Sequence, residues 1–214
     1  MTLKTVFTTR ILFYLTLCVI AGLAINATLS APSPEIVIKK TSKQMLKALE
    51  ENHDAVIADP NNIYQLIDTI ALPHFDIEAI VRSILGKFFR QATAEQHRAF
   101  RIEFQTLLMH IYAKAFLEYT DEKVRVFPVS PDALMSNRVK VQTLIEGKQI
   151  QPVSIIYRMH VKKGEWKIYD FSVEGVSLVL NYRQSFAEQI KKDGLDILIA
   201  NLAEKNAEFN LYGD

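Results

Sequence analysis

The feature that most constrains the fold of this chain is a change of hydrophobic period near residue 120. Before that point apolar residues recur at the spacing of an α-helix, and over residues 123–173 they alternate with polar residues as in a β-strand. After Ser177 the helical spacing returns. Helices, then strands, then helices predict an α+β domain, because blocks of one kind pack together rather than interleaving.

The N-terminal block predicts several helices, of which two carry capping signals. Residues 34–51 and a stripe from Ile63 to Ile70 have helical spacing. Asp76 is the expected N-cap of a helix that runs to Phe88, with apolar residues at i, i+3, i+4 and i+7. Thr93-Ala-Glu-Gln96 fits a capping box that opens a long apolar helix.

The central block predicts a four-stranded sheet. Strands are expected over residues 123–129, 138–146, 151–161 and 165–173, joined by short turns, so that sequential hairpins form a twisted antiparallel sheet. In the last strand we expect Trp166 and Ile168 to face one way, and Tyr169, Phe171 and Val173 the other. A strand that is apolar on both faces is covered on both sides, so the helices should wrap the sheet.

The N-terminal residues predict a secretory signal peptide rather than part of the domain. Lys4 and Arg10 precede an uncharged run over residues 11–25, and small residues follow it. We expect a signal peptide over residues 1–27, with the cut between 24 and 31, and a single domain over 32–208. The one cysteine, Cys18, lies in the apolar run, so the mature chain would have neither disulfides nor thiol chemistry.

A search for catalytic, metal and nucleic-acid signals finds none of good quality. The formal charge is +1 without a basic stripe, and no two of the five histidines are four residues apart. Gly175-Val-Ser177 lacks the second glycine of a nucleophile elbow, so Ser177 is expected to cap the next helix. Asp170 and Glu174 lie ~13 Å apart on an extended strand. We expect Asp170 to pair with a cation such as Arg158, and Glu174 to cap or bridge at the corner.

Two blocks of short motifs resemble a known family. The motifs are Leu85-Gly86 before Phe88-Phe89, Arg90-Gln-Ala-Thr93, Trp166-Lys-Ile-Tyr-Asp170, Val173-Glu-Gly-Val-Ser177, Asn181-Tyr-Arg-Gln184 and Gly194-Leu-Asp-Ile-Leu-Ile199. In this order they resemble the MlaC family of the Mla pathway, also called toluene-tolerance auxiliary proteins, from about Lys39 to Leu202.

The resemblance implies a soluble periplasmic phospholipid carrier that is not an enzyme. Its expected partners are phospholipid, an outer-membrane lipoprotein complex (MlaA-like) and an inner-membrane ABC transporter with an MCE-domain subunit (MlaD-like), between which it would move lipid to maintain outer-membrane asymmetry. It also implies a four-stranded sheet wrapped by helices, with acyl tails in an apolar cavity between the layers. We expect a monomer with no cofactor, no metal and no nucleic-acid partner; the bound phospholipid is cargo.

Facing patterns, rather than family motifs, select the residues expected to contact the tails. They are Ile80, Ile84, Leu108, Ile111, Tyr112, Val141, Ile155, Tyr157, Tyr169, Phe171 and Val176. Two other hypotheses stay open at this point. One is a small pocket enzyme of isomerase type with Asp170 as its base, and the other is an interaction or chaperone module whose apolar residues form an ordinary filled core.

Overall fold

The protein is described here by a computed structural model over residues 32–59, 61–117, 123–147 and 151–211. The predicted signal peptide over residues 1–27 lies outside these ranges. The part from Ala31 to Asp214 forms one compact unit. Within the described ranges no helix has a stretch long and apolar enough to cross a bilayer.

The first described elements are one long helix and a series of short helical segments. α2 (Pro34–Glu51) is followed by α3 (His53–Ala58) and α4 (Asn62–Leu66). The stripe after Ile63, predicted as one helix, instead passes from α4 into a π-helical turn, η1 (Ile67–Ala71), and a 3₁₀ turn, η2 (Leu72–His74). Pro73 in the 3₁₀ turn has no N–H to continue α-helical hydrogen bonding, which accounts for the interruption.

Both predicted N-caps are confirmed. The Asp76 carboxylate accepts a hydrogen bond from Ala79 N (3.1 Å) at the start of α5 (Ile77–Leu85). Thr93 and Gln96 form the reciprocal capping box of α6 (Ala94–Leu117), with distances of 3.2 and 2.9 Å. The expected extension of α5 to Phe88 is wrong, because Gly86 has φ +54° and redirects the chain into a 3₁₀ turn, η3 (Gly86–Arg90).

The sheet is an antiparallel meander in the order β1-β2-β3-β4-β5. The strands are β1 (Lys123–Val126), β2 (Arg138–Glu146), β3 (Val153–Lys162), β4 (Glu165–Val173) and β5 (Val176–Ser177). Four strands were expected; the fifth is a two-residue strand formed when the Glu174-Gly175 turn folds back on β4. Both turn residues have positive φ, +48° and +83°, as in a two-residue hairpin loop of type I′.

A β-bulge in β4 corrects the predicted facing of its side chains. Met159 of β3 pairs with Ile168, but the next pair is Arg158 with Asp170, so Tyr169 is an extra residue. The extra residue shifts the alternation, and Phe171 and Val173 share a sheet face with Trp166 and Ile168. The expectation that these pairs face opposite sides is therefore wrong. Asp170 and Ser172, on the other face, are nonetheless buried.

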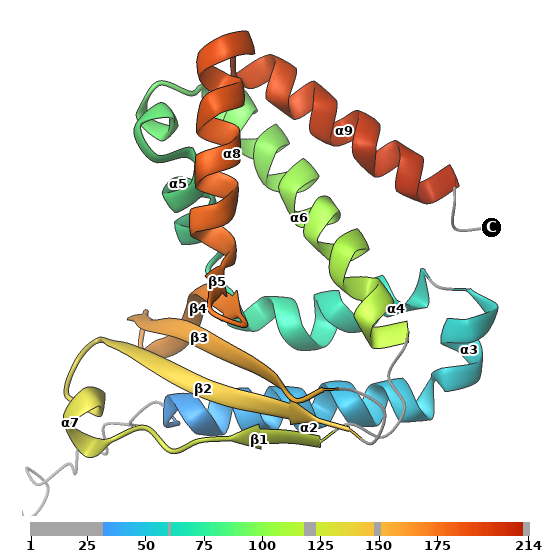
Figure 1. Ribbon diagram of the computed structural model, residues 1–214, viewed down its shortest axis with the longest axis vertical. Coiled ribbons are helices and arrows are strands. Elements are labelled where there is room, and N and C mark those ends of the chain that lie inside the picture. The colour runs from blue at the N-terminus through green and yellow to red at the C-terminus, as the bar shows by residue number, and fades with distance from the viewer. Residues whose placement is uncertain (1–31, 60, 118–122, 148–150, 212–214) are drawn as a thin grey trace, which may run out of the picture. The chain divides into compact units, whose positions relative to one another are not determined.

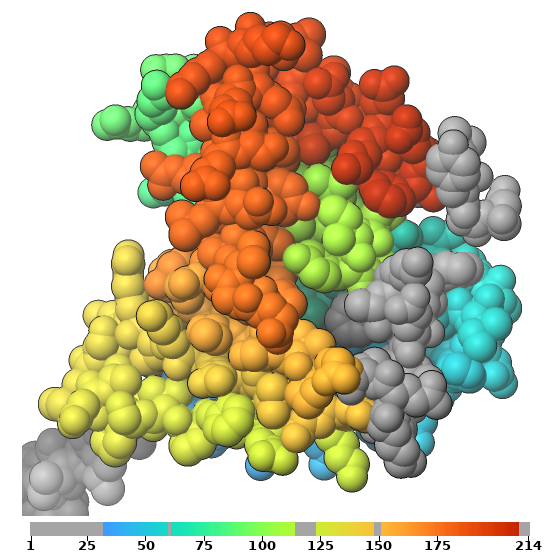
Figure 2. All heavy atoms as spheres, in the orientation of Figure 1, coloured from blue at the N-terminus to red at the C-terminus, as the bar shows by residue number. Residues whose placement is uncertain are grey.

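The helices form two groups (Figure 1): α2 of the first group, and α5 and α8 (Leu178–Asp193) of the second, contact the sheet, whereas α9 (Leu195–Leu211) packs on other helices. α2 runs along the sheet, where Ile38 shares a buried cluster with Val141, Met159 and Ile168. The second group contains α5, α6, α8 and α9, which bury a common aliphatic and aromatic cluster. Figure 2 shows the atoms of α8 meeting the sheet at the end where the helix begins.

Candidate functional site

Phe171 of β4 joins the two helix groups at the centre of the domain. Its ring lies 5.6 Å from that of Tyr112 on α6, 6.3 Å from that of Phe75 and 6.5 Å from that of Tyr157 on β3. Phe75 packs against both the α2 cluster and the α5–α6–α8–α9 cluster. These four rings, from four segments, form what we call the aromatic centre.

The aromatic centre is less tightly enclosed than the core around it. Ile80 and Ile84 of α5 are each 1% exposed, whereas all four rings of the centre are only partly buried. Tyr157 keeps accessible surface, yet burial raises the pKa of its hydroxyl to about 12, against the opposing effect of a hydrogen bond with Thr143. The cause is desolvation, which disfavours the charged form of the hydroxyl.

Two further tyrosines make this region polar without making it charged. Burial raises the pKa of Tyr112, and burial together with the proximity of Tyr112 raises the pKa of Tyr182 on α8. The Tyr182 ring also packs edge-on against Phe104, at 5.0 Å. Both hydroxyls therefore stay protonated at neutral pH, so they can donate or accept a hydrogen bond but add no charge to the apolar surroundings.

The structure brings together most of the residues predicted to contact acyl tails. Ile80, Ile84, Leu108, Tyr112 and Phe171 belong to or pack against the α5–α6–α8–α9 cluster, and Val141 and Tyr157 belong to or pack against the α2 cluster. Ile155 shares their sheet face, because it pairs with Thr143 and Val173.

Three other predicted contacts are placed elsewhere. Tyr169, the bulge residue, has its ring 5.1 Å from His160 and beneath the Arg138 guanidinium, on the face of the sheet opposite to Phe171. Ile111 is 38% exposed on α6, and Val176 is 62% exposed on β5. For all eleven residues, contact with an acyl tail stays a prediction.

Phe75 and Tyr182 are members of this region that the facing patterns missed. Phe75 precedes the N-cap Asp76, and Ile80 occupies the fourth helical position, so the pair has the spacing of a hydrophobic staple. That spacing could have identified Phe75 from the sequence. Tyr182 lies on α8 among exposed polar neighbours, and no comparable signal marks it.

Asp76 fixes the beginning of α5 to the sheet. It is 5% exposed, and its carboxylate lies 2.9 Å from His160 Nε2 and 2.8 Å from Lys162 Nζ, both on β3. Its backbone N–H donates to Ile168 O at 2.8 Å. Burial alone would raise the pKa of Asp76, but the hydrogen bonds from Lys162, Ala79 N and His160 outweigh it and lower the pKa.

Asp170 fixes the beginning of α8 in the same way. Its carboxylate is paired with Arg158, as predicted, and accepts hydrogen bonds from Ser177 Oγ (2.8 Å) and Val179 N (3.1 Å). Ser177 is the N-cap of α8, also as predicted, accepting from Leu180 N at 3.2 Å. A base needs an oxygen free to reach a substrate, whereas this buried carboxylate is used by the protein itself.

Glu174 bridges the β4–β5 corner to β3. Its backbone N–H donates to Ser154 O at 3.0 Å, and its carboxylate accepts a hydrogen bond from Ser154 N. The predicted bridging role is confirmed. Among the described residues, no three or more His, Cys, Asp or Glu side chains form a group that could hold a metal ion.

The fold and the aromatic centre define an α+β domain in which helices and a meander sheet surround an apolar, partly accessible interior. The chain belongs to the MlaC family, because the sequence profile described as MlaC protein matches residues 39–204. This match confirms the resemblance seen in the sequence motifs.

Three relatives are informative. Over 171 residues the chain is 29% identical to the toluene tolerance protein ttg2D of Pseudomonas putida, with 79% of each chain covered. Over 197 residues it is 22% identical to the intermembrane phospholipid transport system binding protein MlaC of Haemophilus influenzae, covering 91% of this chain and 92% of the relative. A phospholipid-binding protein from Ralstonia solanacearum, solved in complex with a phospholipid, superposes with a TM-score of 0.77 at 26% identity, covering 84% of this chain and 99% of the neighbour.

Proposed function

We propose that this protein is a phospholipid carrier of the periplasm, whose acyl tails lie between the α5–α6–α8 helices and the sheet. In this proposal the aromatic centre contacts the tails and the head group stays near solvent. The observation that carries it is the aromatic centre, in which rings from four segments meet between the two helix groups and all stay only partly buried. The phospholipid complex of the Ralstonia solanacearum relative supports the same class of cargo.

The energetics of lipid transfer explain why such a carrier is needed. Each CH₂ group buried from water gains about 0.8 kcal/mol, so two tails with about 30 methylenes gain on the order of 20 kcal/mol of gross transfer free energy. A lipid that left a bilayer for water would lose that amount. An interior of uncharged aliphatic and aromatic side chains replaces the bilayer, and no bond has to be made or broken.

The wider role in the proposal follows the family. The N-terminal signal directs export of the protein and is then cleaved. The mature protein acts as a monomer and moves phospholipid between an outer-membrane lipoprotein complex and an inner-membrane ABC transporter with an MCE-domain subunit. This exchange keeps the two leaflets of the outer membrane different. The name of the Haemophilus influenzae relative, an intermembrane phospholipid transport system binding protein, supports this placement.

The first test is the composition of the purified protein. The chain is expressed with its own signal, purified from periplasm without detergent and examined by native and denaturing mass spectrometry. A mass excess that resolves into stoichiometric phospholipid is the expected result. A protein that is empty, and stays empty after incubation with liposomes, would overturn the proposal in favour of a filled-core interaction module.

A matched pair of variants on α6 links the cargo to the interior. Leu108 packs against the α5–α6–α8–α9 cluster, whereas Ile102 on the same helix is 49% exposed. Leu108→Trp adds bulk where the tails would lie and should greatly reduce bound lipid, while Ile102→Trp should leave it unchanged. Equal lipid content in two folded variants would refute the proposed location of the tails.

A further inference from the structure

The β1–β2 hairpin separates before its tip. β1 pairs with β2 as far as Val126, and Phe127 N donates one more hydrogen bond to Gln142 O at 3.0 Å. Pro128 has no N–H with which to continue the ladder. The chain then leaves β2, forms the short helix α7 (Pro131–Leu134) and returns at Arg138, so the first residues of β2 have lost their neighbour strand.

This separation leaves a short free edge on β2. Gln142 directs its carbonyl toward β1, and backbone groups two residues apart in a strand point the same way, so the N–H and C=O of Lys140 face the vacated side. No described residue of the β1–α7 segment makes a backbone hydrogen bond to Lys140. A strand edge in this state can accept an extended segment of another chain.

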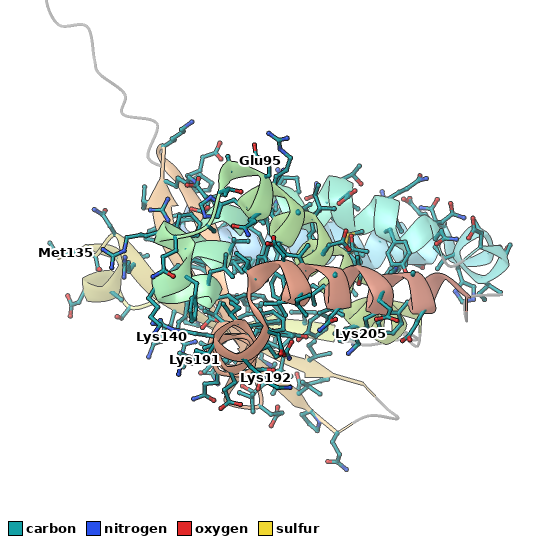
Figure 3. The ribbon with its side chains drawn as sticks, turned by 90° about the horizontal axis from the view of Figure 1, so that it is seen from above. Glu95, Met135, Lys140, Lys191, Lys192 and Lys205 are labelled. Carbon is teal, nitrogen blue, oxygen red and sulfur yellow. The ribbon has the colours of Figure 1, made fainter. Side chains whose placement is uncertain are left out.

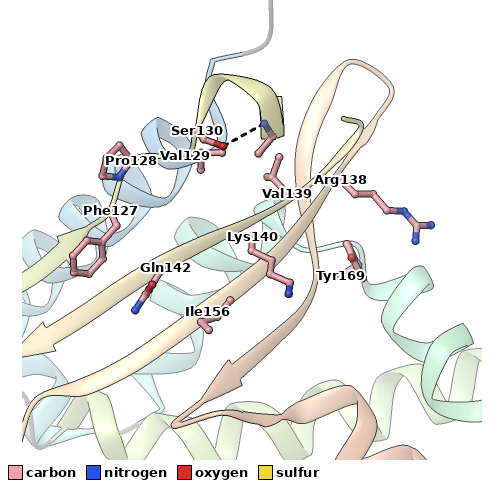
Figure 4. Close-up of a pocket in the computed structure, with 11 residues that line it drawn as sticks. Phe127, Pro128, Val129, Ser130, Arg138, Val139, Lys140, Gln142, Ile156 and Tyr169 are labelled. Carbon is pink, nitrogen blue, oxygen red and sulfur yellow. Dashed lines mark hydrogen bonds between the residues drawn. The ribbon is translucent and has the colours of Figure 1, made fainter. Parts of the chain in front are cut away.

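A hollow of about 490 Å³ lies over this free edge (Figure 4). Phe127, Ile156 and Tyr169 give it an aromatic and aliphatic lining, and all three are partly buried. Arg138 and Lys140 add two cationic side chains to the lining, which contains no acidic residue. Its volume falls within the range of ligand pockets in proteins.

Arg138 and Lys140 differ from other cations of the same sheet face. Arg158 and Lys162 are each bound to a buried aspartate. The Arg138 guanidinium instead lies 5.6 Å from the centre of the Tyr169 ring, and among the described residues neither Arg138 nor Lys140 forms an ion pair with an acid. Figure 3 shows Lys140 projecting outward. The hollow is therefore positive, and its charge is available to a partner.

We propose that this hollow, which we call the β2-edge groove, binds a short, extended, acidic segment of a partner protein. Carboxylates of the segment meet Arg138 and Lys140, an apolar side chain enters between Phe127 and Tyr169, and the segment's backbone bonds to Lys140 N–H and C=O. The inference rests on the proposed carrier function, since a carrier has to dock on proteins at each membrane. A peptide fits better than a membrane surface, because a flat surface reaches neither a recessed lining nor a strand edge.

The probe is a fluorescein-labelled peptide of sequence Glu-Thr-Phe-Thr-Glu-Thr, whose two Glu and one Phe share one face of an extended strand, measured by fluorescence anisotropy with the lipid-loaded protein. We expect saturable binding that weakens as salt is raised, and no binding of the same peptide with Lys in place of Glu. A version with N-methylated amides should bind more weakly, because it cannot pair with the β2 edge. Equal binding of the acidic and basic peptides would overturn the proposal, and equal binding of the N-methylated version would remove the strand-edge contact from it.

Two double variants with the same change of charge locate the site. R138E/K140E should weaken peptide binding by about tenfold or more, because like charges would then face each other across the groove. K191E/K192E, on two exposed lysines in the last turn of α8, should leave binding unchanged. Equal loss in both variants, or binding of phosphatidylglycerol vesicles in place of the peptide, would overturn the proposal.

Lipid content separates this inference from the carrier function on which it rests. Mass spectrometry of both double variants should show the same phospholipid stoichiometry as the unmodified protein, because the groove lies on the sheet face opposite to Phe171. Circular dichroism checks that R138E/K140E folds, and R138Q/K140Q replaces it if it does not. Lipid-loaded protein that does not bind the acidic peptide would refute the β2-edge groove proposal alone. Lipid-free protein that binds the peptide would refute the carrier proposal alone.

Discussion

Replacing Asp170 by Asn separates a structural role of this carboxylate from a catalytic one. Asn keeps the shape of the side chain but has one acceptor oxygen and no charge, so Arg158 loses its counter-charge. Arg158 and Ser177 both donate to Oδ2 and Val179 N donates to Oδ1, so either that pair of donors or Val179 N loses its acceptor. Breaking a buried ion pair costs about 3–5 kcal/mol, and the Arg158 side chain is 29% exposed, so water offsets part of the loss. We expect the free energy of unfolding to fall by about 2–3 kcal/mol.

The assay is urea unfolding followed by the fluorescence of Trp166, the one tryptophan, which is 8% exposed. In a domain of this size the expected loss lowers Tm by roughly 4–12 °C. Asp54→Asn, at an exposed position of α3, is the control and should change stability by less than about 0.5 kcal/mol. If Asp170→Asn were as stable as the control, the anchoring role would be refuted, and a stable variant that had lost a measurable turnover would restore the enzyme hypothesis.

Three further outcomes are expected. Ile155→Glu places a carboxylate on the sheet face that contains Phe171, and should reduce co-purified phospholipid at least about tenfold, as measured by lipid extraction. Because the pKa of Asp76 is lowered, its contribution to stability is present above an unfolded-state pKa of about 3.9 and is lost as pH falls through the lower folded value. The unfolding free energy of Asp76→Asn should therefore change less than that of the unmodified protein in acid titrations below about pH 4. Gly86→Ala forces a side chain into φ +54° and puts its Cβ 3.3 Å from Arg183 Nε. The free energy of unfolding measured in urea should fall by about 1–3 kcal/mol, and an unchanged value would contradict the strain argument.

Local features of the fold could be predicted because their cause is local. The Asp76 cap and the Thr93–Gln96 capping box each need only a short polar side chain a few residues from the N–H it satisfies. The pairing of Asp170 with Arg158 was predicted from opposite charges on neighbouring strands, but the two residues lie opposite each other only because the bulge at Tyr169 shifts the register by one residue.

Features that depend on tertiary packing could not be predicted. The bulge at Tyr169 adds one residue to β4 without a glycine or proline to mark it, and it moves Phe171 and Val173 to the face of Ile168, opposite to Tyr169. A slip of one residue inverts every facing inference that follows it. The separation of β1 from β2 was hidden for a different reason: residues 127–129 continue the apolar and aromatic composition of the strand, and Pro128 alone signals its end.

The two buried aspartates, of which Asp170 carried the enzyme hypothesis, are better explained as groups that satisfy the charges and N–H groups where α5 and α8 meet the sheet. An α-helix that begins against a sheet brings unsatisfied N–H groups to the contact, and β3 brings cations there as well. Asp76 and Asp170 each neutralise a β3 cation and accept a hydrogen bond from the first turn of α5 or α8. The charge neutralisation and the helix capping both take place where α5 and α8 begin. The side chains around Phe171 are therefore aliphatic, aromatic or neutral tyrosine hydroxyls. Removing the Asp170 carboxylate would leave Arg158 without its acid where α8 begins, whereas removing the Asp76 carboxylate would leave Lys162 with Glu78 alone, 3.7 Å away, so the loss at Asp170 should be the larger.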